Sequence, residues 1–301
     1  VCQCIQEEKS QQGLSWEAET MSKTKTPRKA KVNKRAGSYK PGSLRYIWYK
    51  IRTTPTAMIG TCFIIGLFLF SFVSPFVLSN DPLAIDILNQ NARPSWEHIF
   101  GCDEIGRDIF ARIIYGARYT MSIGIFTTAI SCIVGGLLGA IAGYFGGHTD
   151  NLIMRILDVF QSFPGILLSI TISTVLGPGF SKIILALGIS MIPGYARMMR
   201  ASIMRIRDSE YIEAEQSINC PTYRIIARHI VPNAMSPLIV QAAMGIASAG
   251  LAASTLSFLG FGIQAPTPEW GSMLSGARNY IRNYPHLCIF PGLFIMATVV
   301  S

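Results

Sequence analysis

The residues of this 301-residue sequence that could do chemistry are few and scattered. The four histidines, His98, His148, His229 and His286, form no HExxH pair and no cluster with metal-ligand spacing. The sequence has no G-x-S-x-G nucleophile motif and no Gly-x4-Gly-Lys-Ser/Thr phosphate loop. We therefore expect no catalytic, metal-binding or cofactor-binding residue in this chain.

Charged side chains gather in two polar segments between apolar stretches. The first, His98–Gly116, reads HIFGCDEIGRDIFARIIYG and places Arg107 next to Asp108. Adjacent opposite charges can contact a substrate, but a structural role is more frequent, and we expect that role here. We expect Arg112 and Arg118 to anchor the start of the apolar run that follows.

The second segment, Asp208–Asn233, reads DSEYIEAEQSINCPTYRIIARHIVPN. Ser209 or the aspartate before it can cap a helix whose positive first turn would hold two glutamates. Asn219 suits the turn that ends a helix, Pro221 suits the first position of another, and Pro232 would stop that one. The pattern predicts a short helix-turn-helix. On its first helix one face would hold Tyr211, Ala214, Glu215 and Ile218, with the small Ala214 exposed.

Composition indicates a membrane protein. Half of the residues are apolar and only 14% are charged, against roughly 25% in soluble domains. Because the apolar residues form blocks long enough to cross a bilayer, a large soluble helical domain is a poor alternative. The net charge of +9 would suit nucleic acid. The basic residues, however, cluster in the N-terminal tail and one interior loop, so we expect no nucleic-acid partner.

Six apolar runs predict about six transmembrane helices, since one span needs about 20 apolar residues. Prolines at 164, 193 and 291 predict kinks. The last run is still apolar where the sequence stops, which we interpret as a truncated sixth helix. The runs cover Ala57–Leu78, Tyr119–Phe145, Ile153–Leu176, Ile183–Ala196, Leu238–Ile263 and the residues from Leu287 to Ser301.

The distribution of basic residues predicts a cytoplasmic N-terminus. In that orientation the inner segments hold eighteen Lys and Arg after residue 20, and the outer segments hold seven. The polar, basic residues 1–44 predict a disordered cytoplasmic tail. Met21 is consistent with a natural start, which would make residues 1–20 an upstream extension. Residues 45–118 would form the first transmembrane helix and an outer loop, and 119–301 a helical core that contains the segment 208–233.

Small residues recur at helix-packing spacing in two of the runs. Residues of this size every four positions let two helix backbones approach closely within lipid. We therefore predict close helix contacts in both runs. The residues are Gly135, Gly139, Gly143 and Gly147 in one run, and Gly245, Ala249 and Ala253 in the other.

One acidic residue, Asp158, falls about one turn inside the third run. A carboxylate at the centre of a bilayer costs about 2.5–3.5 kcal/mol on insertion scales. Arg155, three residues away, could pair with it near the cytoplasmic interface. We favour this pairing over a role in a transport pathway.

The second polar segment resembles the EAA loop of ABC-importer permeases, whose pattern begins E-A-A-x-x-x-G and ends with a later Ile and Pro. Glu213 and Ala214 match, whereas Glu215 and Asn219 replace the second Ala and the Gly. The resemblance implies a coupling helix that docks into a groove of a cytoplasmic ATPase, where a small Ala side chain permits close contact. The implied docking residues, of which the last two stand for the final Ile and Pro, are Tyr211, Glu213, Ala214, Glu215, Ile218, Asn219, Ile230 and Pro232.

The first polar segment resembles the H-x-x-G-T-D-x-x-G-R-D-x-x-S-R-x-x-Y-G signature of C-type permease subunits of the dipeptide/oligopeptide (nickel) family. Cys102 and Ala111 replace the Thr and the Ser. The stretches FLGFGIQAPTPEWG (258–271) and IFPGLFIMATV (289–299) resemble the same subfamily, and the resemblance extends over almost all of 45–301. The residues that match the signature are His98, Gly101, Asp103, Gly106, Arg107, Asp108, Arg112, Tyr115 and Gly116.

The resemblance implies an all-α integral membrane protein with the type I ABC-importer permease fold, whose coupling helix lies between the fourth and fifth membrane helices. It implies a permease subunit of a bacterial or archaeal cytoplasmic membrane that moves short peptides by alternating access, without enzymatic activity of its own. The implied partners are a second permease subunit, two cytoplasmic ATPase subunits that bind ATP and Mg²⁺, an extracytoplasmic substrate-binding protein and membrane lipid.

Other cargoes and other classes of membrane protein stay open as alternatives. Nickel and glutathione importers use closely similar subunits. An ion-gradient transporter would need internal repeats and broken helices with ion ligands, and the apolar runs contain too few carboxylates for that. An intramembrane protease would need a Ser–His or paired-Asp site, yet Asp158 alone lies convincingly within a span.

Overall fold

The computed structural model describes residues 52–77, 81–218 and 220–301, which form helices, turns and loops without a strand. The chain divides into two compact units, Val1–Met58 and Ile59–Ser301. The first unit is described only from residue 52. Helix α3 (Pro55–Val77) begins three residues later and continues into the second unit. The predicted tail 1–44 lies outside the described residues.

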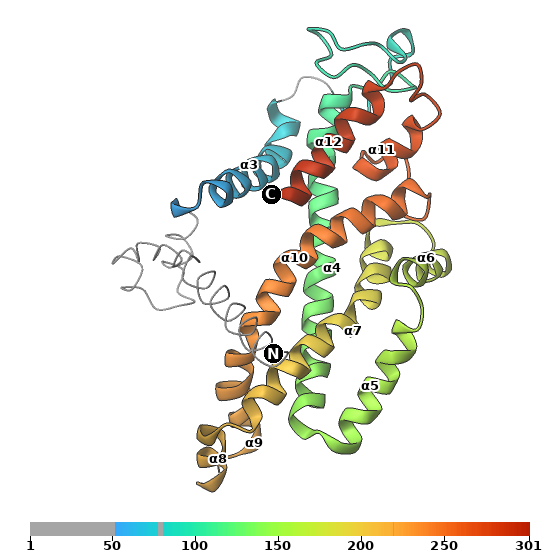
Figure 1. Cartoon of the computed structure of the whole chain (residues 1–301). Helices are drawn as coiled ribbons and strands as arrows, with labels where there is room; N and C mark the ends of the chain where they lie inside the picture. Colours follow the sequence, from blue (N-terminus) through green and yellow to red (C-terminus); the bar gives the residue numbers. More distant parts are fainter. Residues whose placement is uncertain (1–51, 78–80, 219) are drawn as a thin grey trace, which may run out of the picture. The chain divides into compact units, whose positions relative to one another are not determined.

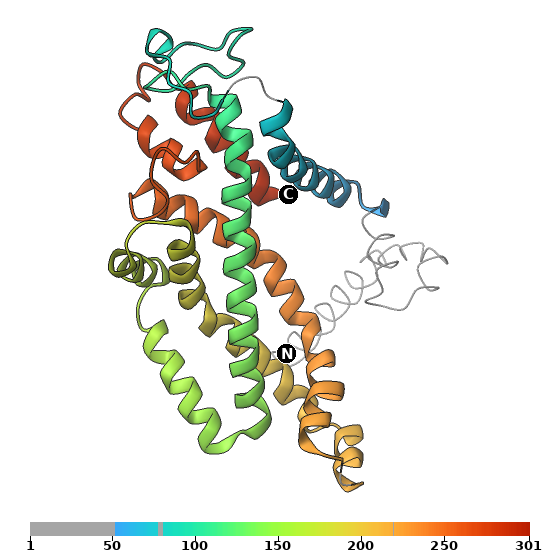
Figure 2. The ribbon, with the colours of Figure 1, turned by 180° about the vertical axis from the view of Figure 1, so that it is seen from behind.

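The second unit is organised around three long helices, α4, α7 and α10, which pack on one another in both views (Figures 1 and 2). α5 and α6 lie between α4 and α7 in the chain and are bent by 84° at a short break. Two helices follow α10. The bounds are Ile109–Phe145 for α4, Gly147–Gln161 for α5, Gly165–Leu176 for α6, Phe180–Arg207 for α7, Val231–Phe258 for α10, Trp270–Ala277 for α11 and His286–Val300 for α12.

Four helices of the described chain are long and apolar enough to cross a membrane, and the α5–α6 pair makes five if it counts as one broken span. The four begin at Pro55, Ile109, Phe180 and Thr222. α12 is also apolar but has only 15 residues. The all-helical prediction is confirmed, while the number of six spans stays a prediction.

Glycines of α4 bring this helix into close contact with α7. A Cβ atom on Gly139 would lie 2.2 Å from the Ala196 carbonyl oxygen. Gly135 and Gly143 meet the backbone of α7 in the same way, so close packing is confirmed at these three positions. The prediction is wrong for Gly147, which has no atom within 4 Å of a built Cβ. That residue lies beyond the end of α4 and begins α5.

Two boundaries differ from the sequence prediction. α4 begins at Ile109 and not near Tyr119, because Asp108 caps it and its first turns tolerate arginines. The third predicted run is two helices, since the chain leaves helical geometry at Pro164, whose ψ is 130°. A proline disfavours helical geometry at the residue before it, which accounts for the break.

Apolar side chains form three separate clusters in the second unit. One cluster joins α7 to the 208–233 segment and includes Tyr195, Met199, Ile203 and Ile212. The second surrounds Trp270 of α11, which packs on the first turns of α4. The third lies between α4, α7 and α10. The first of these clusters therefore fixes the polar segment to the membrane helices.

Candidate functional site

The polar segment 208–233 forms a short helix, α8 (Glu210–Ser217), at one end of α7. The loop 81–108 precedes α4 and lies at the end of this helix that is far from α8 (Figures 1 and 2). Ser209 lies between α7 and α8, and its carbonyl accepts hydrogen bonds from the amides of Ile212 and Glu213, at 2.9 and 3.2 Å. The Ser209 hydroxyl donates instead to the Ile206 carbonyl of α7, at 2.6 Å. Of the two residues predicted as alternatives to cap α8, Ser209 therefore starts the helix with its backbone carbonyl and not with its side chain.

One side of α8 is buried against the ends of α7 and α10. Ile212 is fully buried and belongs to the cluster that contains Tyr195 and Ile203 of α7. Ile225 and Ile230, which follow α8 in the chain, belong to the same cluster and are also buried. Movement of α8 therefore has to displace side chains that pack directly on two membrane-length helices.

The other side of α8 is exposed and partly apolar. Ile218 is 74% exposed and Tyr211 is 45% exposed, with Glu213 and Ala214 exposed between them. Glu215 differs, because it is half-buried and its carboxylate lies 3.6 Å from Nε2 of His229. Three of the four residues predicted to share a face are thus exposed, and the fourth turns toward the following helix. Asn219 lies outside the described residues.

The helix that follows α8 does not end at Pro232. Residues Thr222–Arg224 form a helical turn (α9), Ile225–Ile230 a π-helical turn, and Val231 begins α10 without interruption. The predicted stop is therefore wrong. Pro232 is the second residue of α10 and lies directly after the π-helical turn, inside one helical run from Thr222 to Phe258. This continuity joins the α8 region directly to a membrane-length helix.

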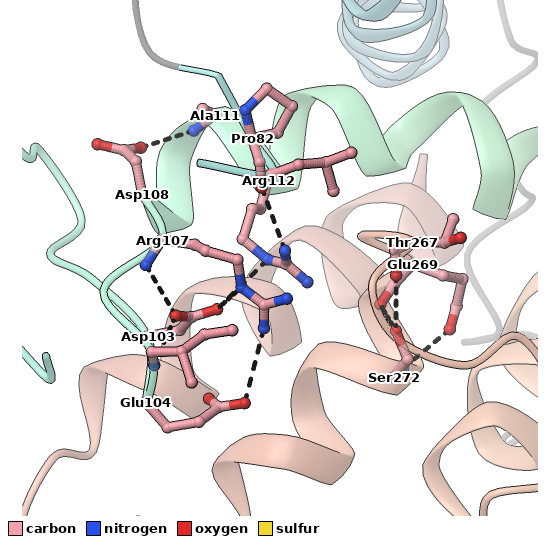
Figure 3. Close-up of polar contacts among 12 residues, drawn as sticks. Pro82, Asp103, Glu104, Arg107, Asp108, Ala111, Arg112, Thr267, Glu269 and Ser272 are labelled. Atoms are coloured by element: carbon pink, nitrogen blue, oxygen red, sulfur yellow. Dashed lines mark hydrogen bonds and ion pairs between the residues drawn. The ribbon is translucent and has the colours of Figure 1, made fainter. Parts of the chain in front are cut away.

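Buried charges organise the loop 81–108 at the other end of α4 (Figure 3). Asp103 accepts hydrogen bonds from the amide and from Nε of Arg107, at 2.9 and 2.6 Å. Nε of Arg112 lies 3.6 Å from the same carboxylate, and Nη1 of Arg112 donates to the Pro82 carbonyl at 3.2 Å. Glu104 lies 3.7 Å from Arg107. We call these four charged residues the Asp103 cluster; its contacts support the structural role predicted for Arg107.

Asp108 and His98 form a second set of contacts in this loop. Oδ1 of Asp108 accepts the amide of Ala111 at 2.8 Å and so caps α4. Oδ2 of Asp108 lies 2.8 Å from Nδ1 of His98. The signature glycines have a conformational reason, since Gly106 has a φ of +83° and a Cβ there would lie 1.7 Å from the Asp86 carbonyl. The structure thus brings His98 and the signature residues from Gly101 to Asp108 together in one folded loop, while Arg112, Tyr115 and Gly116 follow in the first turns of α4.

A cavity of about 340 Å³ lies between the Asp103 cluster and the segment 257–287. Arg107, Arg112 and Glu104 contribute to its lining from one side, and Gln264 and Ser272 from the other. Arg112 is almost fully buried, and its Nε makes no hydrogen bond. The positive and negative charges of the cluster balance, so the cavity wall is polar without a net charge.

Sequence reasoning missed Glu269, which is fully buried at the start of α11. Its carboxylate accepts hydrogen bonds from the Ser272 amide at 2.9 Å and the Ser254 hydroxyl at 3.2 Å. Burial raises the pKa of Glu269 above its ordinary value, against the lowering effect of these hydrogen bonds. A signal was available, because Glu269 is the only acidic residue of the sequence after Glu215.

Asp158 pairs with Arg197 of α7 and not with Arg155. The predicted partner lies on the same helix as Asp158, whereas α5 packs on α7 and so brings Asp158 close to Arg197. A second pair joins the same two helices, with Asp150 accepting both Nε and Nη2 of Arg200 at 2.5 Å. Within the described residues, no group of three or more His, Cys, Asp or Glu side chains could hold a metal ion.

Two family models match the chain. Residues 135–301 match the family described as "Binding-protein-dependent transport system inner membrane component". Residues 43–94 match the "N-terminal TM domain of oligopeptide transport permease C". Together the two matches cover the part of the loop 81–108 up to residue 94 and all helices from α5 to α12, including α8.

Curated relatives cover most of the chain. The dipeptide transport system permease protein DppC of Alkalihalophilus pseudofirmus is 40% identical over 85% of this chain and 84% of its own length. The probable D,D-dipeptide transport system permease protein DdpC of Escherichia coli K12 is 36% identical over 85% and 86%. The glutathione transport system permease protein GsiD of Pectobacterium atrosepticum is 37% identical over 85% and 86%.

Two solved structures of the MetNI methionine ABC transporter, both in inward-facing conformations, share the fold. One aligns with a TM-score of 0.51 and 15% identity over 63% of this chain and 96% of its own. The other aligns with a TM-score of 0.53 and 17% identity over 64% and 91%. At this level of identity the similarity concerns the fold alone.

Proposed function

The chain belongs to the binding-protein-dependent transport system inner membrane components, as an ABC-importer permease subunit of the oligopeptide and dipeptide C type, and from this premise we propose that it carries short peptides across the cytoplasmic membrane by alternating access. In this proposal the N-terminus is cytoplasmic. A second permease subunit completes the channel, two ATPase subunits bind α8 and its counterpart, and a substrate-binding protein delivers the peptide at the loop 81–108.

The exposed side of α8 is the observation that carries the proposal. A helix held by a buried Ile212 presents Tyr211, Ala214 and Ile218 outside the membrane-length helices. Exposed apolar side chains around a small residue suit a groove on a partner protein. ATP-driven closure of the ATPase subunits would then move α8, and through the Ile212 cluster it would move α7 and α10.

Replacing Ala214 with Trp tests the docking role. We expect Ala214→Trp to insert into the membrane at the level of the parent chain and to retain less than a tenth of the co-purifying ATPase, because the indole would fill the contact. Thr222→Trp is the matched control, since Thr222 is also exposed but lies on α9. Normal ATPase recovery with Ala214→Trp would contradict the docking role of α8.

The cargo needs a separate test, because relatives of nearly equal similarity are named for different substrates. The dipeptide relative favours short peptides, and the glutathione relative favours glutathione as the second candidate. The complete importer in proteoliposomes would be supplied with its binding protein and with radiolabelled dialanine, glutathione or Ni²⁺. We expect ATP-dependent uptake of dialanine, and uptake of glutathione or nickel alone would replace peptides as the cargo.

A further inference from the structure

Two polar contacts join α8 to the helical run that follows it. Oε1 of Glu215 lies 3.6 Å from Nε2 of His229, and the Asn233 amide nitrogen lies 3.5 Å from the Tyr211 hydroxyl. The two residues on each helix are four positions apart, so they share one face of that helix. α8 lies beside the start of α10 in both views (Figures 1 and 2). We call these four residues the polar ladder.

The side chain of Asn233 links the two contacts of the polar ladder. Its amide nitrogen donates to the His229 carbonyl, one helical turn earlier, at 2.8 Å. His229 itself lies in the π-helical turn Ile225–Ile230. Turns of this kind are rare and frequently lie at functional sites. The ladder therefore fastens α8 to the point where the helical geometry changes before α10.

The polar ladder adds direction to the apolar contacts that hold α8. Ile212 of α8 is fully buried together with Ile225 and Ile230. Apolar attraction is non-directional, whereas a charged or hydrogen-bonded contact needs a particular partner in a particular place. The ladder therefore favours one orientation of α8 among those that bury Ile212.

Glu215 is less exposed than its neighbours on α8. Its side chain and that of His229 are each 29% exposed, whereas Glu213, Ala214 and Ile218 are exposed. An alanine stands at position 215 in the EAA pattern, and the contact with His229 gives the longer side chain a place to lie. The charge of Glu215 is thus directed toward the following helix and away from the exposed side of α8.

We propose that Glu215 is a positioning residue, which through His229 holds α8 in the orientation in which Ala214 and Ile218 meet the ATPase. This inference rests on the proposed docking of α8 and replaces the direct docking contact that the EAA resemblance implies for Glu215. The groove of the ATPase then needs no cationic side chain opposite position 215, because the protonated imidazole of His229 supplies the opposite charge. A protein that populates its binding-competent orientation more fully binds its partner more tightly.

Exchange of the two charges tests the proposal. The dissociation constant of the added ATPase is measured on the permease subunits in nanodiscs, at about pH 6 so that imidazoles are largely protonated. We expect Glu215→Lys to raise this constant by about fivefold, because two cations would then face each other. Glu215→Lys combined with His229→Glu should restore the parent value, since the attraction returns. Arg228→Gln is the matched control, because Arg228 is exposed beside His229, and it should leave the constant unchanged.

Neutral variants test the same pair if the lysine variant fails to insert. Glu215→Gln and His229→Gln should each raise the dissociation constant by about twofold to fivefold, the range for a partly exposed ion pair. The double variant should raise it no further than either single variant, because each residue acts through the other. Additive effects would overturn the proposal. Parent-like binding by Glu215→Lys, or no recovery when His229→Glu is added to it, would overturn it as well.

Ala214→Trp in the same assay separates this proposal from the docking role of α8. If Ala214→Trp loses the ATPase while every variant at positions 215 and 229 binds as the parent does, α8 docks and the positioning role of Glu215 is wrong. If Ala214→Trp binds as tightly as the parent, the docking role itself fails, and the positioning role fails with it.

Discussion

Arg200 of α7 holds Asp150 of α5 through two contacts of 2.5 Å, one from Nε and one from Nη2. Asp150 also lies in the first turn of α5, where the helix dipole favours a negative charge. The pair therefore fixes the start of α5 against α7 on the side of the molecule where α4 ends. A bidentate arginine contact of this kind has more geometric specificity than a single ion pair.

Removing the charge of Asp150 should weaken this junction. We expect Asp150→Asn to lower the free energy of unfolding by about 1–2 kcal/mol, the range for a charged hydrogen bond at a partly exposed site. Thermal unfolding in detergent measures the change. Asp208→Asn is the control, because Asp208 is largely exposed in its pair with Arg207 and should have little effect. Equal thermal unfolding midpoints for Asp150→Asn and Asp208→Asn would contradict the stabilising role of the Asp150–Arg200 pair.

The contact between α4 and α7 depends on the absence of a side chain at Gly139. We expect Gly139→Ala to cost about 1–3 kcal/mol through overpacking, since its Cβ would meet the Ala196 carbonyl at 2.2 Å. Gly250→Ala in α10 is the matched control because nothing lies within 4 Å of a Cβ there. The same thermal assay separates the variants, and a stable Gly139→Ala protein would refute close packing at this position.

Glu269 should make stability depend on pH. Burial raises its pKa in the folded protein, so folding favours the protonated form. Its stabilising contribution is complete below the ordinary pKa of a glutamate and is lost as the pH rises through the raised folded value. We expect the unfolding midpoint of the parent chain to fall between pH 4.5 and pH 8 by more than that of Glu269→Gln, which cannot ionise. Parallel pH profiles for the two proteins would contradict the raised pKa.

Cys102 should resist alkylation. It is fully buried, and burial together with Asp108 and Asp103 raises its pKa to about 11. The thiolate is the reactive form of cysteine, so iodoacetamide at pH 8.5 should modify Cys102 at least tenfold faster in denatured than in native protein. Mass spectrometry of the Cys102 peptide gives both rates. Equal rates would mean that the loop 81–108 opens readily.

Patterns that depend on neighbours along the chain predicted the helices and the small-residue contacts well. Apolar runs located every membrane-length helix, and the four-residue glycine spacing located the contact of α4 with α7. The exposed side of α8 also followed from local spacing. In each case the residues that form the pattern are close in sequence and lie on one helix.

Features that depend on distant partners could not be read from the sequence. Asp158 was expected to pair with Arg155, because a sequence shows only local partners, yet the packing of α5 on α7 brings Asp158 to Arg197. Pro232 was expected to end a helix, but the helical run from Thr222 continues through it, with a π-helical turn directly before α10. Glu269 gains its role from Ser254 of another helix.

The length of α4 has a mechanical consequence. Its 37 residues span about 55 Å at 1.5 Å per residue, well beyond a hydrocarbon core of about 30 Å. One rigid rod therefore runs from the Asp108 cap to the end where α5 begins. A tilt of about 5° would move its far end by about 5 Å, by simple leverage on that length. A movement of α4 as one body would therefore shift the loop 81–108 and the start of α5 together.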